Sequence, residues 1–289
     1  MCMLMPVQLY AAALETSNQS IASFLEPNDY AEVSTAIINA HIAGKTYRPD
    51  ANNPSEFSEV STPNFVKRFA LSNVALKLQV QPEWSLGLIY DQPYTTDISY
   101  AFKPVLSSSA QLVNAVNFKT DSDNLTALLG YQPNLSWNYY GGVSYQNLDT
   151  QLQISGQSMG LLMDYSANAE NDSAMGWLAG ISYQIPAYAL KTSLTYRSKI
   201  RHHPLLQEQI FSTPTILALN LSAARHINIE TPQSVNFDFQ SGINPNNLIY
   251  TSLRWVNWEK FKIISPLLST TEPVSLVDYK KISSPAHWV

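Results

Sequence analysis

The residues able to do chemistry are few in this chain. It has one cysteine, Cys2, and its five histidines are His41, His202, His203, His226 and His287. His202 and His203 are adjacent, so in an extended segment their side chains point in opposite directions and do not share one metal ion. The acidic pairs Asp121/Asp123 and Glu170/Asp172 resemble solvated loop acids more than calcium ligands. We therefore expect no metal site.

Motifs of enzymes are also missing from the sequence. There is no Gly-Xaa-Ser-Xaa-Gly motif, phosphate-binding loop or dinucleotide fingerprint. A lipid hydrolase would need a serine and a histidine on the same side of a strand pair, and the sequence supports no such pairing. We expect no catalytic residues and no cofactor, and we expect that the protein is not an enzyme.

The composition excludes two classes of protein. Only 13% of the 289 residues are charged, against about 25% in ordinary soluble domains. The net charge of −5 leaves no basic excess, so nucleic acid is not an expected partner. No apolar run approaches the roughly 18 residues of a membrane-spanning helix. Sixteen tyrosines and six tryptophans suit a transmembrane β-barrel, although a soluble all-β protein fits almost as well.

Strict alternation of residue types runs through most of the chain. Val74, Leu76 and Leu78 share one face of an extended segment, and Lys77 lies on the other. We expect Val74, Leu76, Leu78, Phe237 and Phe239 to face outward. The predicted strands are 30–43, 66–80, 84–94, 118–132, 137–154, 174–184, 188–200, 232–243 and 248–264, with a tenth candidate at Val274–Lys280.

Short turns and long polar stretches separate these strands in a regular order. Each short turn contains a proline: Pro82, Pro133, Pro186 or Pro245. Aromatic residues lie beside the turns, at Trp84, Tyr131, Trp137, Tyr183, Tyr188 and Tyr250. The predicted long loops are Ser99–Lys119, Ser155–Asp172 and Arg201–Glu230. Short turns at one end, long loops at the other and a ring of aromatic side chains are typical of outer-membrane barrels. The alternative is a β-sandwich, which leaves the aromatic residues unexplained.

The N-terminal residues form a separate region. The apolar stretch Met1–Ala13 ends in Ala11-Ala12-Ala13, which resembles a signal-peptide cleavage site. The first basic residue is Lys45, so the usual basic start is missing, and residues 1–13 are interpreted either as a clipped signal peptide or as a plain apolar N-terminus. Cleavage would leave a mature chain without cysteine, which suits an oxidising compartment.

Four segments resemble the FadL, OmpP1 and toluene-transporter family of outer-membrane transporters of Gram-negative bacteria. They are Leu14–Pro27, Gly176–Tyr183 followed by Leu194–Lys199, Thr231–Ser234 with the strand after it, and Arg254–Phe261. Their order and spacing together carry the resemblance, which runs from about Leu14 to Tyr279.

The resemblance implies a fourteen-stranded antiparallel transmembrane β-barrel with an N-terminal plug. About nine to ten strands are expected here, so incomplete closure follows, and we expect a truncated or frameshifted copy. The family's Asn-Pro-Ala plug motif is absent, which leaves residues 14–29 as a short plug segment and 30–289 as a partial barrel. The implied function is passive transport of long-chain fatty acids or hydrocarbons across the outer membrane, where lipid and lipopolysaccharide surround the protein.

Such a ligand needs an apolar lining and a cation for a carboxylate head. The candidate ligand-binding residues are Phe24 and Leu25 in the plug, Leu128, Tyr140 and Leu178 in the wall, and the cations Lys191, Arg197 and Arg254. In the alternative interpretation, the apolar residues only pack plug against wall, and the cations are paired with Asp238 or Glu15. Alternative functions are a surface barrel acting as an adhesin or structural protein, a non-functional truncated copy, and a barrel-borne lipid hydrolase.

Overall fold

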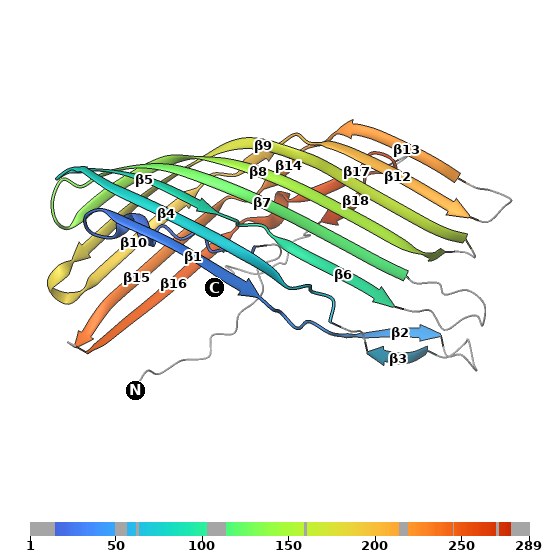
Figure 1. The fold of residues 1–289 in the computed structure, drawn as a ribbon, viewed down its shortest axis with the longest axis horizontal. Helices are drawn as coiled ribbons and strands as arrows, with labels where there is room; N and C mark the ends of the chain where they lie inside the picture. Colours follow the sequence, from blue (N-terminus) through green and yellow to red (C-terminus); the bar gives the residue numbers. More distant parts are fainter. Residues whose placement is uncertain are drawn as a thin grey trace.

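The computed structural model describes residues 15–49, 57–61, 64–102, 114–158, 161–213, 219–244, 246–269 and 272–278. The N-terminal stretch 1–13 and Cys2, for which a signal peptide was predicted, lie outside these residues. One curved sheet dominates the structure and has the outline of half a barrel wall (Figure 1). Its main strands, in spatial order, are β1 (Tyr30–Ile38), β4 (Phe69–Gln81), β5 (Trp84–Asp91), β7 (Asn114–Tyr131), β8 (Trp137–Ser158), β9 (Leu161–Ile185), β10 (Leu190–Arg197), β15 (Ser234–Asn244) and β16 (Asn247–Val256).

This order confirms the predicted all-β antiparallel fold. Each neighbouring pair of the nine main strands is antiparallel, and the nine correspond one to one with the nine strands predicted from the sequence. Within the described residues, β1 and β16 are the two edges of the wall and are not paired with each other.

Further short elements extend or flank the wall. β6 (Thr96–Phe102) pairs with β7, and β12 (Leu205–Thr213) lies between β9 and β13 (Leu219–His226). Separate two-stranded sheets join β2 (Lys45–Pro49) to β3 (Phe57–Ser61), β11 (Ile200–His202) to β14 (Ile229–Thr231), and β17 (Lys262–Ser265) to β18 (Val274–Asp278). The 3₁₀ helices are η1 (Ala22–Leu25), η2 (Pro186–Tyr188) and η3 (Trp258–Lys260).

The prediction of three long polar loops was wrong. β6 and the start of β7 occupy the two ends of Ser99–Lys119, whose middle, residues 103–113, lies outside the described residues. β8 and β9 continue through most of Ser155–Asp172, and β11 to β14 lie in Arg201–Glu230. Alternation persists in these segments, but it is hard to see in the sequence because the buried positions in β9 include alanines, Ala167 and Ala169, between polar exposed residues.

The last predicted strands also needed correction. The segment 248–264 is not one strand, because β16 ends at Val256 and the backbone turns through η3 before β17 begins. The side chain of Asn257 accepts a hydrogen bond from the backbone N–H of Glu259 (3.2 Å), which stabilises that turn. The tenth candidate is present as β18, but it pairs with β17 and not with the wall.

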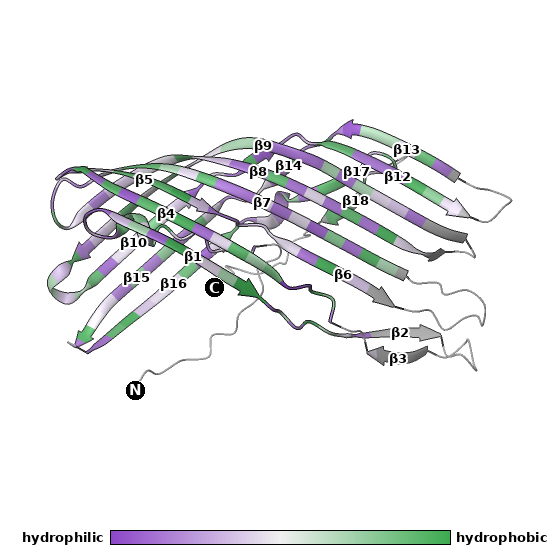
Figure 2. Cartoon of the chain, viewed as in Figure 1, coloured by the Kyte–Doolittle hydropathy of each residue, from purple (hydrophilic) through white to green (hydrophobic). Residues whose placement is uncertain are grey.

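The outer face of the wall is apolar near the short turns. Val74, Leu76 and Leu78 of β4 are all exposed, with Phe237 of β15, as predicted, whereas Phe239 is half-buried. Figure 2 shows the alternation as bands of apolar and polar residues along each strand. Exposed aliphatic side chains over several adjacent strands are the expected lipid-facing surface of an outer-membrane barrel.

Strand β7 marks where this apolar surface ends. Leu125 and Leu129 point outward near the turn, but further along the strand the outward positions are the charged residues Lys119, Asp121 and Asp123. The inward positions go from apolar Leu128 near the turn through polar Asn124 to apolar Phe118. Along β7 the outer face is therefore suited to lipid near the short turn and to water further along the strand.

A β-bulge in β9 changes the face of the sheet on which the apolar side chains of this strand lie. Leu148 of β8 pairs with Asp172, but Thr150 pairs with Ala169, so β9 contains one extra residue at this point. An extra residue moves all later side chains to the other face. Trp177 therefore points outward, whereas Tyr165, also an odd-numbered residue, is buried on the inner side.

The four short connections gather at one end of the sheet, shown at the left of Figure 1. Aromatic rings pair there across neighbouring strands, with centroids 4.8 Å apart for Trp84 and Tyr131 and 4.7 Å apart for Trp137 and Tyr183. Rings at the ends of lipid-facing strands form the aromatic girdle of outer-membrane barrels. Among the described residues, no helix has the length and apolar character needed to cross a membrane.

Candidate functional site: the N-terminal segment on the inner wall

Residues 15–29 lie against the concave face of the wall. Ile21 and Phe24 are each only 1% exposed, and Leu25 is also buried. The backbone turns at Gln19 and Asn28, both with positive φ (48° and 59°), and these turns bring η1 down onto the strands. This N-terminal segment thus has a buried apolar side facing the wall.

The apolar seat beneath it consists of inward-facing wall residues. Its members are Ala75, Ile89, Leu128, Tyr140 and Leu178, and they form one cluster with Ile21, Phe24 and Leu25. The rings of Phe24 and Tyr140 meet edge to face with centroids 6.1 Å apart, a favourable geometry for two aromatic rings. The structure therefore brings together all five apolar residues that the sequence marked as candidates.

Two wall glycines make room for the ring of Phe24. A Cβ atom added to Gly87 would lie 2.4 Å from Cδ2 of Phe24, and one added to Gly130 would lie 2.9 Å from its Cζ. Both distances are shorter than van der Waals contact, so any side chain at either position would displace the ring or the strand. These inward-facing glycines form a recess that fits Phe24.

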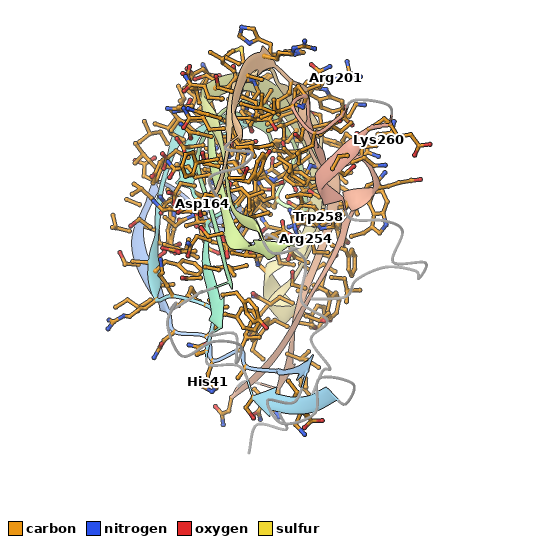
Figure 3. The ribbon with its side chains drawn as sticks, turned by 90° about the vertical axis from the view of Figure 1, so that its right-hand side faces the viewer. His41, Asp164, Arg201, Arg254, Trp258 and Lys260 are labelled. Carbon is orange, nitrogen blue, oxygen red and sulfur yellow. The ribbon has the colours of Figure 1, made fainter. Side chains whose placement is uncertain are left out.

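Two buried arginines bind the other side of the N-terminal segment. The side chain of Arg197 on β10 donates a hydrogen bond to the carbonyl oxygen of Gln19 (2.9 Å). Arg254 on β16 donates from Nε to the carboxylate of Glu15 (2.8 Å) and from Nη2 to the side-chain oxygen of Gln19 (2.9 Å). Figure 3 labels Arg254, whose side chain is buried in the interior. The pairing of Arg254 with Glu15, one of the alternatives predicted from the sequence, is confirmed.

Lysines anchor the end of the N-terminal segment. Lys191 forms an ion pair with Glu26 (2.9 Å), and the buried Lys77 donates to the carbonyl oxygen of Glu26. The side chain of Asp29 accepts from the backbone N–H of Gln79 on β4 (2.8 Å). Every candidate cation, Lys191, Arg197 and Arg254, therefore contacts the N-terminal segment.

A break in the wall lies next to the start of this segment. β5 ends at Asp91 and β6 begins at Thr96, and both pair with β7. At the break, the carbonyl oxygen of Pro93 accepts from the backbone N–H of Thr16 (2.9 Å). The buried carboxylate of Asp91 accepts from the side chains of Asn124 (2.8 Å) and Ser17 (3.2 Å). The N-terminal segment thus contacts both sides of the break.

A cleft of about 310 Å³ separates the N-terminal segment from β1, β4 and β5. Its lining is mostly hydroxyl and amide side chains, with Leu71, Ile89 and two alanines as its apolar part and Glu32 and Asp91 as its carboxylates. The segment therefore fills the concavity only in part.

Several contact residues were missed in the sequence. Lys77 stands alone as a charge in an otherwise uncharged strand, and this was a usable signal for an inward cation. Ile21 and Gln19 carried no signal, because their importance depends on partners far along the chain. His202 is fully buried between Asp172 and Gln146, with 3.2 Å to each, and the described residues contain no cluster suited to a metal ion.

The comparisons agree with this architecture. Residues 15–288 match the model of a family described as outer membrane protein transport protein (OMPP1/FadL/TodX). A crystal structure of a Pseudomonas aeruginosa FadL homologue superposes with a TM-score of 0.58 at 15% identity, over 86% of this chain and 63% of the other. The Pseudomonas putida toluene transporter TodX gives a TM-score of 0.54 at 12% identity, over 90% and 68%. This chain thus spans less than two thirds of the length of the FadL homologue. No curated protein matches its sequence.

Proposed function

Because the chain belongs to the outer membrane protein transport family (OMPP1/FadL/TodX), we propose that it carries hydrophobic compounds passively across the outer membrane. The wall supplies a lipid-facing outer surface, and outer-membrane lipid and lipopolysaccharide are its proposed surroundings. The compounds that we propose are long-chain fatty acids or hydrocarbons.

The observation that carries this proposal is the docking of Phe24 on the apolar seat. An apolar surface inside a wall whose outer face suits lipid has no role in anchoring the protein in the membrane. It is a suitable surface for an apolar ligand, because binding sites combine apolar lining with a few placed polar groups. In this proposal residues 15–29 act as a plug, and a ligand competes with Phe24 and Leu25 for Leu128, Tyr140 and Leu178.

The cations give the proposed site its polar end. Lys191 is half-buried and forms its ion pair with a partly exposed carboxylate, that of Glu26, so a ligand carboxylate can exchange with Glu26 at modest cost. Arg197 and Arg254 are more deeply buried and hold the N-terminal segment itself. We assign Lys191 to ligand capture, and the two arginines to coupling between ligand and plug.

The break between β5 and β6 supports a sideways exit. Movement of the N-terminal segment would remove the hydrogen bond from Thr16 to Pro93 and the one from Ser17 to Asp91. Both hydrogen bonds hold the segment at the break. In this proposal, plug displacement frees the break and an apolar ligand leaves between the strands into the lipid.

Intrinsic fluorescence of the reconstituted protein tests the proposal, since the chain has six tryptophans. We expect saturable quenching on addition of oleate or toluene, and weaker binding after Phe24→Ala, which removes the ring from the seat. Leu135→Ala, a change at an exposed turn residue, is the matched control. No response to either probe would instead favour a surface protein without transport, such as an adhesin.

A hydrolysis assay tests the alternative of a lipid hydrolase. A lipid hydrolase would release product from a chromogenic ester at a rate proportional to protein concentration. We expect no turnover above that of protein-free vesicles, and a protein-dependent rate would contradict a purely passive role.

A further inference from the structure

Residues 257–269 and 272–278, here together called the cap hairpin, are not part of the wall. They comprise η3, β17 and β18, and β17 pairs only with β18 among the described strands. An isolated two-stranded hairpin is marginally stable in water. The cap hairpin therefore depends on what it packs against. Its strands β17 and β18 share no ladder hydrogen bond with the described strands of the wall, and the backbone N–H of Asn257, at its start, donates to the carbonyl oxygen of Gln233 beside β15 (3.0 Å).

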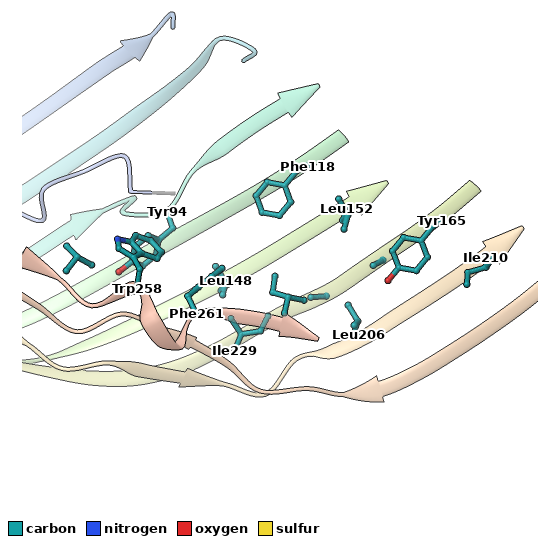
Figure 4. Close-up of a cluster of buried hydrophobic side chains, with 14 residues drawn as sticks. Tyr94, Phe118, Leu148, Leu152, Tyr165, Leu206, Ile210, Ile229, Trp258 and Phe261 are labelled. Atoms are coloured by element: carbon teal, nitrogen blue, oxygen red, sulfur yellow. The ribbon is translucent and has the colours of Figure 1, made fainter. Parts of the chain in front are cut away.

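The surface beneath the cap hairpin is an apolar strip on the inner wall, at the end away from the short turns. The strip consists of Phe118, Leu148, Leu152, Ala167, Ala169, Leu206 and Ile210. Trp258, Phe261 and Ile263 of the cap hairpin are buried in the same cluster, with Leu276 and Val277 at its edge. Figure 4 shows Trp258 and Phe261 of the cap hairpin beside the labelled wall residues of this cluster. The strip is separate from the apolar seat under Phe24, whose residues form a different cluster.

The turn after β17 is fastened to the wall by a buried carboxylate. Glu208 on β12 is 1% exposed and accepts hydrogen bonds from the Ser265 hydroxyl and from the backbone N–H of Leu267 (2.9 Å). It also accepts from the Tyr165 hydroxyl of the wall (2.6 Å). Among the described residues, no ion pair joins Glu208 to a cationic side chain. A buried carboxylate without a counter-charge is costly, so this arrangement calls for a role beyond packing.

We propose that the cap hairpin is a lid whose apolar side chains occupy a binding surface for hydrocarbon chains, and that Glu208 is its latch. This inference rests on the proposed function, because it places a first site for the transported compound before the apolar seat. When the latch opens, Phe261 and Ile263 leave the strip, and the hydrocarbon part of a ligand takes their place. The ligand then covers the apolar area of the strip that the lid had covered, so the exchange is nearly balanced.

Cysteine labelling of the reconstituted protein tests the lid without any ligand. In a Cys2→Ser background, Ile263→Cys places a thiol on the buried side of β17, and Ile264→Cys places one on its exposed side as the matched control. We expect a maleimide to label Ile263→Cys at least tenfold more slowly than Ile264→Cys. Equal rates would show that the strip is not covered and would overturn the proposal.

Two variants test the role of Glu208 as a latch, one by changing the hydrogen-bond acceptor and the other by removing a donor. Glu208→Gln weakens the acceptor, since hydrogen bonds to a charged group are about twice as strong as neutral ones, and Ser265→Ala removes a donor without changing the wall. Each should raise the labelling rate of Ile263→Cys several-fold and leave that of Ile264→Cys unchanged. If neither does so in protein whose circular dichroism retains the β-sheet signal, Glu208 is not a latch.

An experiment with oleate distinguishes a failure of the lid proposal from a failure of the transport proposal. We expect oleate to accelerate labelling of Ile263→Cys over the concentration range in which it quenches tryptophan fluorescence. Quenching without faster labelling would overturn the lid and leave the transport proposal intact. Absence of both responses would overturn the transport proposal, and with it the assignment of the strip to hydrocarbon chains.

Discussion

Arg254 and Glu15 form a buried ion pair between residues 239 positions apart in the chain. Both side chains are nearly inaccessible, at 1% and 5% exposure. The guanidinium group also donates to Asn236 and Gln19, so its positive charge has further hydrogen-bond acceptors around it. This pair connects the first described residue of the chain to the edge strand of the wall.

Glu15→Gln should destabilise the docked N-terminal segment by about 3 kcal/mol, because removing one partner leaves the other charge buried without compensation. Limited proteolysis of the protein in detergent would detect release of the segment, and urea unfolding would give the free energy. The double variant Glu15→Gln/Arg254→Gln should lose less stability than Glu15→Gln alone. Glu83→Gln, in an exposed turn, is the control; an equal loss there would contradict a specific role for the pair.

Gly87→Ala should displace Phe24, because the new Cβ would lie 2.4 Å from its ring. The expected cost is about 1–3 kcal/mol, the usual range for overpacking. In the background of Phe24→Ala the same change should cost much less, because the clash is gone, and this non-additivity identifies the recess. Proteolytic release of residues 15–29 and thermal unfolding would measure it.

Gly141→Ala is the matched control for the recess. A Cβ at Gly141 would lie 3.5 Å from the carbonyl oxygen of Leu178, an ordinary contact. The effect of Gly141→Ala on stability should be small both in the wild-type background and in the Phe24→Ala background. A large effect that is independent of Phe24 would instead indicate a general intolerance of side chains in these strands.

Leu76→Arg should impair insertion into phospholipid vesicles. An arginine on the lipid-facing side of a barrel costs about 2–4 kcal/mol at the centre of the bilayer and about 0–1 kcal/mol near its surfaces. Leu221→Arg on β13, which is similarly exposed but far from the short turns, should cost little. Folding titrations in vesicles would compare the two, and equal costs would contradict the boundary observed along β7.

Acid should open the pairing of β11 with β14. Burial alone would raise the pKa of Glu230, but Lys199 (3.0 Å) and Arg201 (3.1 Å) outweigh it and lower the pKa below its ordinary value. A lowered pKa gives stability that is present above the unfolded value of about 4.3 and is lost as the pH falls through the folded value. The protection of residues 200–202 against hydrogen exchange, taken relative to the intrinsic exchange rate at each pH, should therefore decrease below about pH 4.3. In Glu230→Gln this protection should no longer change over the same range.

The sequence predicted the wall well where one face meets lipid. Alternation as strong as that of Val74, Leu76 and Leu78 is a local property, so it needs no knowledge of partners. The prediction of strands failed beyond the lipid-facing band. There the apolar residues lie on the inner face, and the bulge in β9 shifts the alternation of buried and exposed residues by one position. Polar outward residues such as Asp121 then resemble loop residues.

The site was predictable in part for the same reason. Leu128, Tyr140 and Leu178 are apolar residues on faces that are otherwise polar, and this inconsistency marked them in the sequence. Their gathering around Phe24 depends on the curvature of the sheet, which no local pattern specifies. The role of these residues in ligand binding stays a prediction until binding is measured.

The contacts of residues 15–29 also constrain the order in which the molecule can assemble. The segment bonds to β4 at one side of the wall and, through Asn18 and Glu15, to Asn236 on β15 and Arg254 on β16 at the other. The segment is synthesised before these strands, but it can dock only after nearly the whole sheet has formed, because its partners lie on both sides of the wall. The contacts between residues 15–29 and residues 236–254 also close a long loop, and the formation of such contacts is slow. Docking of residues 15–29 is thus a late step in folding, and an undocked segment marks a chain whose sheet has not yet formed completely.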